Sequence, residues 1–232
     1  MFRPSHLALP FLLLLTTPAI AAGPVTADAF HHARALAKAD GIDIPEDVVV
    51  QRALSHLTTR GEAFMRRGLD RRDDWAPLVD RAIEDAGLPP LIAAVPLIES
   101  GYSNWGAPDS REVSSASPGT IPGRGLWMFI PETARLYGMK VNARTDDRLD
   151  PERETEAAMA LLTDLHDRYN DWGLALAAYN QGSRAVDAAI EAGESRDVLR
   201  LIEAGHLNPY AARVMAGALL LADPGLLDGP SR

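Results

Sequence analysis

Apolar residues recur along most of the chain every three or four positions, which is the spacing of a helix with one buried face. The segment after Trp75 is typical, and its apolar positions are Leu78, Val79, Ala82, Ile83 and Ala86. Gly87 follows, and glycine is common just beyond a helix end. Strict alternation of apolar and polar residues is nearly absent, so the pattern predicts an all-α fold.

Further helices are expected wherever this spacing meets a start or stop signal. Proline is tolerated in the first turn of a helix, so Asp150-Pro151 is expected to begin a long one. The expected helical ranges are 27–39, 45–60, 75–86, 131–137, 151–170, 172–179 and two or three more within 183–222. The last twenty residues, broken by glycine and proline, are expected to be a weak tail.

Residues 88–101 form the most apolar segment after the N-terminal one. Pro89 and Pro90 suit a helix start and Gly101 suits its end, whereas Pro96 should kink the helix between them. Residues 102–124 are rich in Gly, Ser, Pro, Asn and Asp. This composition predicts a loop after the apolar helix.

Composition agrees with a helical protein, because Ala and Leu dominate the 47% of residues that are hydrophobic. A length of 232 residues fits one domain with extensions. The net charge of −9, without Lys/Arg clusters, argues against nucleic acid as a partner and against electrostatic adhesion to anionic membranes. The lack of cysteine excludes disulfides, thiolate metal sites, cysteine nucleophiles and a lipid anchor on cysteine.

The N-terminus has the layout of a secretory signal peptide. Arg3 and His6 precede an apolar run from Leu7 to Leu15, and small residues follow at 19–22. The run is shorter than the ~20 residues of a spanning helix, so a membrane anchor is the less favoured alternative. We therefore expect a periplasmic or secreted protein without a stable membrane anchor. Its expected parts are a signal peptide (1–21), a helical extension (22–74), a central domain (75–190) and C-terminal helices with a tail (191–232).

Glu99 stands out on physical grounds. It follows a run of apolar residues that contains no other charge, and it lies at the expected end of a helix. Desolvation and the negative end of the helix dipole both raise a carboxyl pKa. A carboxyl that keeps its proton near neutral pH can act as a general acid. The alternative is an ordinary glutamate that faces solvent at a helix end.

Three short motifs follow one another in the central domain: Glu99-Ser100-Gly101-Tyr102, then Gly125-Leu126-Trp127-Met128-Phe129-Ile130-Pro131, then Ala177-Ala178-Tyr179-Asn180-Gln181-Gly182. In this order and spacing they resemble the catalytic domain of soluble-lytic-transglycosylase-type murein hydrolases, over about residues 75–190. Val95-Pro96 before the Glu-Ser pair is most similar to the membrane-bound lytic transglycosylase D subgroup. The stretch from Asp146 to Pro151 also resembles the family's segment between the second and third motifs.

The resemblance implies an all-α, goose-lysozyme-like domain with a long cleft, and peptidoglycan glycan strands as the partner. It implies that Glu99 is the catalytic acid and base. Glu99 would protonate the glycosidic oxygen between N-acetylmuramic acid and N-acetylglucosamine, and would then deprotonate the C6 hydroxyl. The product would be a 1,6-anhydromuramic end, and neither a metal nor a cofactor is expected. Such a reaction is a substrate-assisted exception to the two-carboxylate scheme of most glycosidases.

The resemblance also implies a set of substrate-binding residues, namely Ser100, Tyr102, Gly125, Met128, Tyr179 and Asn180. Gly125 would let the backbone approach the sugar closely, or would be an ordinary turn glycine. Ser100 would contact substrate or orient Glu99, or would only cap the helix. Tyr179 and Asn180 would line the cleft, or would only end a helix. Trp127 and Phe129 are expected to be core residues.

Two departures from the family pattern bear on activity. Relatives usually carry Gln where Met128 stands, and Met cannot make the amide hydrogen bonds that Gln makes to a substrate acetamido group. The loop from Gly106 to Arg124 is longer than usual and replaces a short Ser-Gly-Ala link. Both features bear on rate and substrate range more than on fold.

Two rival functions remain open from the sequence. A hydrolytic lysozyme of the same fold would need a second carboxylate to position water, and Asp109 and Glu112 in the long loop are candidates. A glycan-binding or scaffold protein would have lost turnover altogether. The retention of Glu99 argues against this second rival.

Overall fold

The computed structural model describes residues 25–107 and 123–228, and these residues are almost entirely helices and their connections. The described residues form no strand. They contain only isolated bridges between Trp105 and Gly125, Arg124 and Phe129, and Val141 and Asp146. The prediction of an all-α fold is therefore confirmed.

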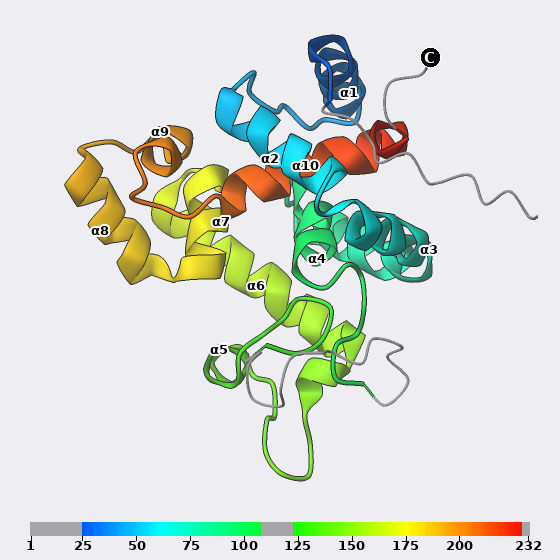
Figure 1. Ribbon diagram of the computed structural model, residues 1–232. Helices are drawn as coiled ribbons and strands as arrows, with labels where there is room; N and C mark the ends of the chain where they lie inside the picture. Colours follow the sequence, from blue (N-terminus) through cyan, green and yellow to red (C-terminus); the bar gives the residue numbers. More distant parts are fainter. Residues whose placement is uncertain (1–24, 108–122, 229–232) are drawn as a thin grey trace, which may run out of the picture.

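The helices are, in chain order, α1 (Ala27–Ala39), α2 (Val48–Thr58), α3 (Glu62–Asp85), η1 (Pro90–Ala93), α4 (Ala94–Glu99), α5 (Pro131–Leu136), η2 (Asp147–Leu149), α6 (Pro151–Tyr169), α7 (Trp172–Gln181), α8 (Ser183–Gly193), α9 (Val198–Glu203), α10 (Tyr210–Ala222) and η3 (Pro224–Leu227). The η elements are 3₁₀ helices, which have a tighter turn than α-helices. Figure 1 shows their arrangement.

Side-chain caps explain why α6 and α7 begin where the sequence predicts. The Asp150 carboxylate accepts hydrogen bonds from the backbone N–H groups of Glu152 and Arg153 at the start of α6, at 3.1 and 3.3 Å. Asn170 then adopts the left-handed conformation that ends α6. Asp171 caps α7 by accepting from the backbone N–H of Leu174 at 2.7 Å. Each cap satisfies a backbone donor that the helix itself cannot pair.

Two expected boundaries are wrong for identifiable reasons. Helix α3 begins at Glu62 and not at Trp75, and it continues past Pro77, which lies inside it. The expected division between residues 74 and 75 therefore falls within a continuous helix. The segment expected to be one kinked helix is instead η1 followed by α4, and Pro96 lies in the first turn of α4. Proline is tolerated there because that turn has no intrahelical partner for its N–H.

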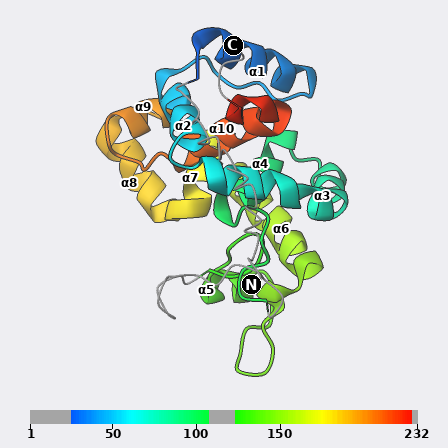
Figure 2. The same ribbon diagram turned by 45° about the vertical axis from the view of Figure 1, so that its right-hand side comes forward.

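Helix α10 lies at the centre of the core. It packs against α1, α2, α4 and α7, and Figures 1 and 2 both show it between α1 and α4. Most of its residues are buried. The expectation of a weak tail over the last twenty residues is therefore wrong, because most of α10 falls within them and is buried. Helix α10 also supports α4, which carries Glu99. Within the parts of the chain that the structure describes, no helix is both long and apolar enough to cross a membrane.

A matched pair of leucines tests this arrangement. Leu219 in α10 is 0% exposed, whereas Leu136 in α5 is 82% exposed. Leu219→Ala should lower the free energy of unfolding by about 2–5 kcal/mol, because it leaves a cavity in the core. Leu136→Ala should change it by less than about 0.5 kcal/mol. Urea unfolding of both variants measures the difference, and equal losses would contradict a central position for α10.

Candidate active site

Glu99 is the last residue of α4, and its half-buried side chain faces a cleft of about 670 Å³. Residues of α5, α6 and α7 and of the segment before α5 form the walls. The lining residues are Glu99, Gly123, Met128, Phe129, Ile130, Thr133, Leu136, Tyr137, Leu161, Leu165, Ala178, Tyr179, Asn180, Gln181, Gly182 and Ser183. Of these lining residues, all in the described part of the chain, Glu99 alone is a carboxylic acid.

The environment of Glu99 favours its protonated form. Burial raises the pKa of the Glu99 carboxyl above its ordinary value, because a charged carboxylate loses hydration there. The Tyr210 hydroxyl and the Asn180 side chain partly offset this effect, since both interact favourably with the charged form. Glu99 therefore keeps its proton at a higher pH than an exposed glutamate does.

Tyr210 is a site residue that the sequence reasoning missed. It begins α10 and is buried, and its hydroxyl forms no hydrogen bond of standard geometry within the described residues. Its ring stacks on that of Tyr179, with centroids 6.4 Å apart and an interplanar angle of 16°. Tyr210 lies far along the chain from the three motifs, so no local pattern could have assigned it to the site.

The structure brings Tyr179 and Asn180 to the cleft beside Glu99, at the C-terminal end of α7. The Tyr179 hydroxyl donates to the backbone carbonyl of Trp127 at 2.7 Å. The Asn180 carbonyl oxygen accepts from the side-chain amide of Asn208 at 2.9 Å. Met128 lies in the same cleft. Four of the expected site residues, Glu99, Met128, Tyr179 and Asn180, are thus together.

Residues 125–129, which we call the strap, contribute Met128 and Phe129 to the lining of the cleft. Leu126 and Trp127 are fully buried. Met128, in contrast, lines the cleft with a left-handed backbone, at φ 56°. Phe129 is buried, as expected for a core residue, yet it also contributes to the lining of the cleft.

Gly125 permits a close approach, but not the one that the sequence suggested. Its φ of 83° is left-handed, and a Cβ atom at this position would collide with the carbonyl oxygen of Arg148 and the carboxyl group of Glu154. The expected approach to a sugar is therefore replaced by an approach to Glu154. This buried glutamate was also missed by the sequence reasoning, because nothing in the helical pattern of α6 distinguishes it.

Ser100 and Tyr102 lie inside the protein and do not line the cleft. The Ser100 hydroxyl donates to the backbone carbonyl of Leu126 at 2.7 Å. The Tyr102 hydroxyl donates to the backbone carbonyl of Ala93 at 2.6 Å. Both side chains are 0% exposed. This geometry corrects the expected substrate contact: Ser100 ties α4 to the strap, and Tyr102 ties the chain after α4 back to η1.

Asp109 and Glu112, the candidate second carboxylates, lie outside the described residues, as do Ser114, Ser115 and Ser117. Over residues 25–107 and 123–228, no group of three or more His, Asp or Glu side chains is arranged to hold a metal ion.

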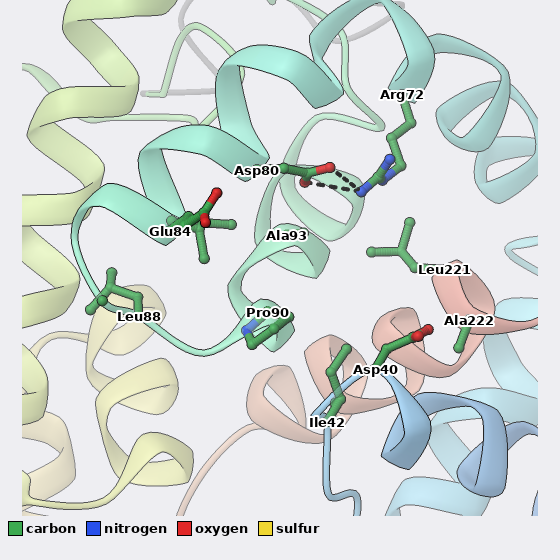
Figure 3. Close-up of a pocket in the computed structure, with 12 residues that line it drawn as sticks. Asp40, Ile42, Arg72, Asp80, Glu84, Leu88, Pro90, Ala93, Leu221 and Ala222 are labelled. Atoms are coloured by element: carbon green, nitrogen blue, oxygen red, sulfur yellow. Dashed lines mark hydrogen bonds and ion pairs between the residues drawn. The ribbon is translucent and has the colours of Figure 1, made fainter.

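A second cavity, of about 590 Å³, lies between α3, η1 and the ends of α1 and α10 (Figure 3). In its wall one guanidinium nitrogen of Arg72 donates to both carboxylate oxygens of Asp80, at 2.9 and 3.0 Å. It shares no lining residue with the cleft. We place the candidate active site in the cleft at Glu99, because the expected residues Met128, Tyr179 and Asn180 also line it.

Comparison with known proteins gives similarities over the same part of the chain. Membrane-bound lytic murein transglycosylase D of Escherichia coli (strain K12) is 27% identical over 138 residues, which are 59% of this chain and 28% of that protein. The putative tributyltin chloride resistance protein of Alteromonas sp. (strain M-1) is 33% identical over 121 residues, which are 52% of this chain and 53% of that protein. The chain therefore matches about half or less of the length of these relatives.

A solved structure, that of an inactive mutant of lytic transglycosylase Slt from Pseudomonas aeruginosa, is 21% identical and has a TM-score of 0.48. The match covers 67% of this chain and 25% of that one. The transglycosylase SLT domain family matches residues 80–200, which include Glu99, the strap and the end of α7. The chain therefore belongs to the transglycosylase SLT domain family.

Proposed function

We propose that this protein is a lytic transglycosylase that cleaves the β-1,4 bond between N-acetylmuramic acid and N-acetylglucosamine in peptidoglycan and leaves 1,6-anhydromuramic ends. The observation that carries the proposal is the placement of Glu99, a half-buried carboxyl with a raised pKa in the cleft of an SLT-family domain. No other carboxylic acid lines the described part of this cleft. A mechanism with one carboxyl group that serves twice fits this arrangement.

In the first step, protonated Glu99 donates its proton to the glycosidic oxygen. The bond from this oxygen to C1 of the muramic residue breaks, and the N-acetylglucosamine leaves with a hydroxyl group. The acetamido oxygen of the muramic residue stabilises the positive charge that develops at C1. The half-buried position of Glu99 supports this role, because its carboxyl group remains protonated at a pH where an exposed one is ionised.

In the second step, the Glu99 carboxylate accepts the proton of the C6 hydroxyl group. Oxygen O6 then forms a bond to C1 and closes the 1,6-anhydro ring. Glu99 ends the cycle protonated, so no water molecule is consumed. The Tyr210 hydroxyl and the Asn180 amide support this step, because they stabilise the ionised carboxylate that must act as the base.

The neutral lining of the cleft supports a sugar substrate. Asn180, Gln181, Thr133 and Ser183 offer amide and hydroxyl groups. The Gln181 side-chain nitrogen is buried and has no hydrogen-bond partner among the described residues. A periplasmic or secreted location, with residues 1–21 as a signal peptide, accords with a substrate that lies outside the cytoplasmic membrane.

The product separates this proposal from its rivals. Digestion of murein sacculi followed by mass spectrometry should give muramic ends that are one water lighter than those left by a hydrolase. Reducing muramic ends would instead favour the hydrolytic lysozyme with Asp109 or Glu112. Binding of sacculi without any product would favour the glycan-binding protein.

Glu99→Gln should abolish cleavage and leave the fold intact. The amide is nearly isosteric, but it cannot donate a proton at neutral pH. Acid–base catalysis typically contributes roughly 10²–10⁴-fold, so we expect at least that loss in kcat. Release of soluble fragments from sacculi measures it, and circular dichroism checks the fold. Turnover at the wild-type rate would overturn the assignment of Glu99.

Tyr210→Phe should move the alkaline limb of the pH–rate profile to higher pH. Cleavage begins with protonated Glu99, so activity falls as the pH rises through the Glu99 pKa. The Tyr210 hydroxyl lowers that pKa, and its removal therefore raises the pKa. Tyr169→Phe is a matched control, because the Tyr169 hydroxyl bonds to Asp187 and to the backbone carbonyl of Ser183. An unmoved or lowered limb in Tyr210→Phe would contradict the assignment.

Met128→Gln should raise kcat/KM on murein. A sugar amide against a thioether leaves a donor or acceptor poorly paired, at a cost of about 1–3 kcal/mol, and Gln would recover part of it. Met128 lines the cleft, and Met and Gln are both unbranched side chains of similar length. If Ser114, Ser115 or Ser117 already supplies the hydrogen bond, Gln would crowd the site. Steady-state kinetics decide, and an unchanged or lower kcat/KM would favour the serines.

A further inference from the structure

Glu154, near the start of α6, is a fully buried glutamate that has no part in the proposed acid–base chemistry. Its two carboxyl oxygens accept hydrogen bonds from two successive backbone N–H groups of the strap. Leu126 N–H donates to one oxygen at 2.6 Å, and Trp127 N–H donates to the other at 3.0 Å. Both oxygens are thus occupied by the protein. Glu154 is therefore not arranged to activate a water molecule, although it lies behind the cleft wall.

We propose that Glu154 is a positioning residue for substrate binding: its carboxylate fixes the strap so that Met128 and Phe129 form the wall of the cleft. The identity of the substrate, a peptidoglycan glycan, rests on the proposed function. The anchoring of the strap by Glu154 does not. Met128 lines the cleft and the two residues before it are held from behind by Glu154. Glu154 thus acts on the glycan through the strap.

The backbone of the strap needs such an anchor. Met128 has a φ of 56° and is not glycine, and this left-handed conformation persists only where the surroundings enforce it. Further hydrogen bonds of Leu126 and Trp127 hold the strap in the same position. The Leu126 carbonyl accepts from Ser100, the Trp127 carbonyl accepts from Tyr179, and the Trp127 indole N–H donates to the Thr155 hydroxyl at 2.9 Å. Without Glu154, the N–H groups of Leu126 and Trp127 would be buried and unpaired.

The charged and titratable groups around Glu154 are compatible with an ionised carboxylate. Arg148 supplies a favourable positive charge, while its own guanidinium binds Asp146 and the Phe129 carbonyl. Tyr179 lies close enough to interact with both Glu154 and Glu99. Burial raises the pKa of Glu154 well above its ordinary value, and the backbone N–H groups and Arg148 only partly oppose that rise. The same N–H groups therefore hold the strap and stabilise the charge.

Glu154→Gln separates charge from shape. The amide can accept from one strap N–H, but its NH₂ group then faces the other N–H, donor against donor. Loss of such a charge-assisted pair should weaken substrate binding by about tenfold or more. The measurement is the Kd for murein sacculi in a pelleting assay, made in the Glu99→Gln background so that no substrate is consumed. In the active protein, KM should rise by a similar factor while kcat changes much less.

Asp147→Asn is the matched control. Asp147 is also a buried carboxylate that accepts a backbone N–H, that of Lys140 at 2.8 Å, but neither residue lines the cleft. The Asp147→Asn variant should have a lower free energy of unfolding without a tenfold change in Kd for sacculi. An equal change in Kd for both variants would reduce Glu154 to general support of the fold, and an unchanged Kd in Glu154→Gln would overturn the proposal.

Glu154→Asp keeps the charge but shortens the side chain by one methylene group, which moves the carboxylate away from the N–H groups of the strap. Its Kd should lie between those of the wild type and Glu154→Gln. If Glu154→Gln does not fold, Glu154→Asp carries the test alone, and a folded protein with unchanged Kd would overturn the proposal. Reducing muramic ends, or no product at all, from the wild-type protein would overturn the proposed reaction. The comparison of Kd values between the Glu154 and Asp147 variants would still hold, so the two failures are distinguishable.

Discussion

The close packing of α4 on α10 is the constraint on which the rest of the site depends. Gly217 in α10 faces Ala94 and Ile98 of α4, and a Cβ atom at Gly217 would lie 3.1 Å from the end of the Ile98 side chain. Glycine at this position leaves the Ile98 side chain room where the two helices meet. This packing buries the end of α4 and sets Tyr210 beside Glu99. The raised pKa of Glu99 is thus a product of helix packing, because packing removes the carboxyl group from water.

Two carboxyl groups that both interact with Tyr179, the half-buried Glu99 and the fully buried Glu154, have different environments. Glu99 opens onto the cleft and meets only side-chain groups, so its proton is available to a ligand. Glu154 is enclosed, and two backbone N–H groups occupy its oxygens. Residue type alone does not separate these roles. The direction of the nearest hydrogen-bond donors does, because a carboxyl group whose oxygens are already bound within the protein cannot exchange protons with a substrate.

Much of the fold could be predicted from the sequence, because helix periodicity and capping are local signals. The starts of α5, α6 and α7 coincide with the predicted ones. The signals failed where tertiary packing decides. Pro77 sits inside α3, and the 3₁₀ turn of η1 precedes α4. In the site, motif resemblance found Glu99 and its cleft neighbours Met128, Tyr179 and Asn180. It could not show that Ser100 and Tyr102 turn inward, or that Tyr210 and Glu154 approach from distant helices, since neither fact is encoded in local spacing.

The left-handed backbone of Met128 limits how this position can drift during evolution. At φ 56°, side chains that branch at Cβ are strongly disfavoured, whatever their polarity. Valine, isoleucine and threonine are therefore poor replacements here, even where the cleft would accept their volume. An unbranched residue such as Gln can replace Met128 without this backbone penalty. Backbone geometry thus restricts which residue types fit at this position, independently of the ligand.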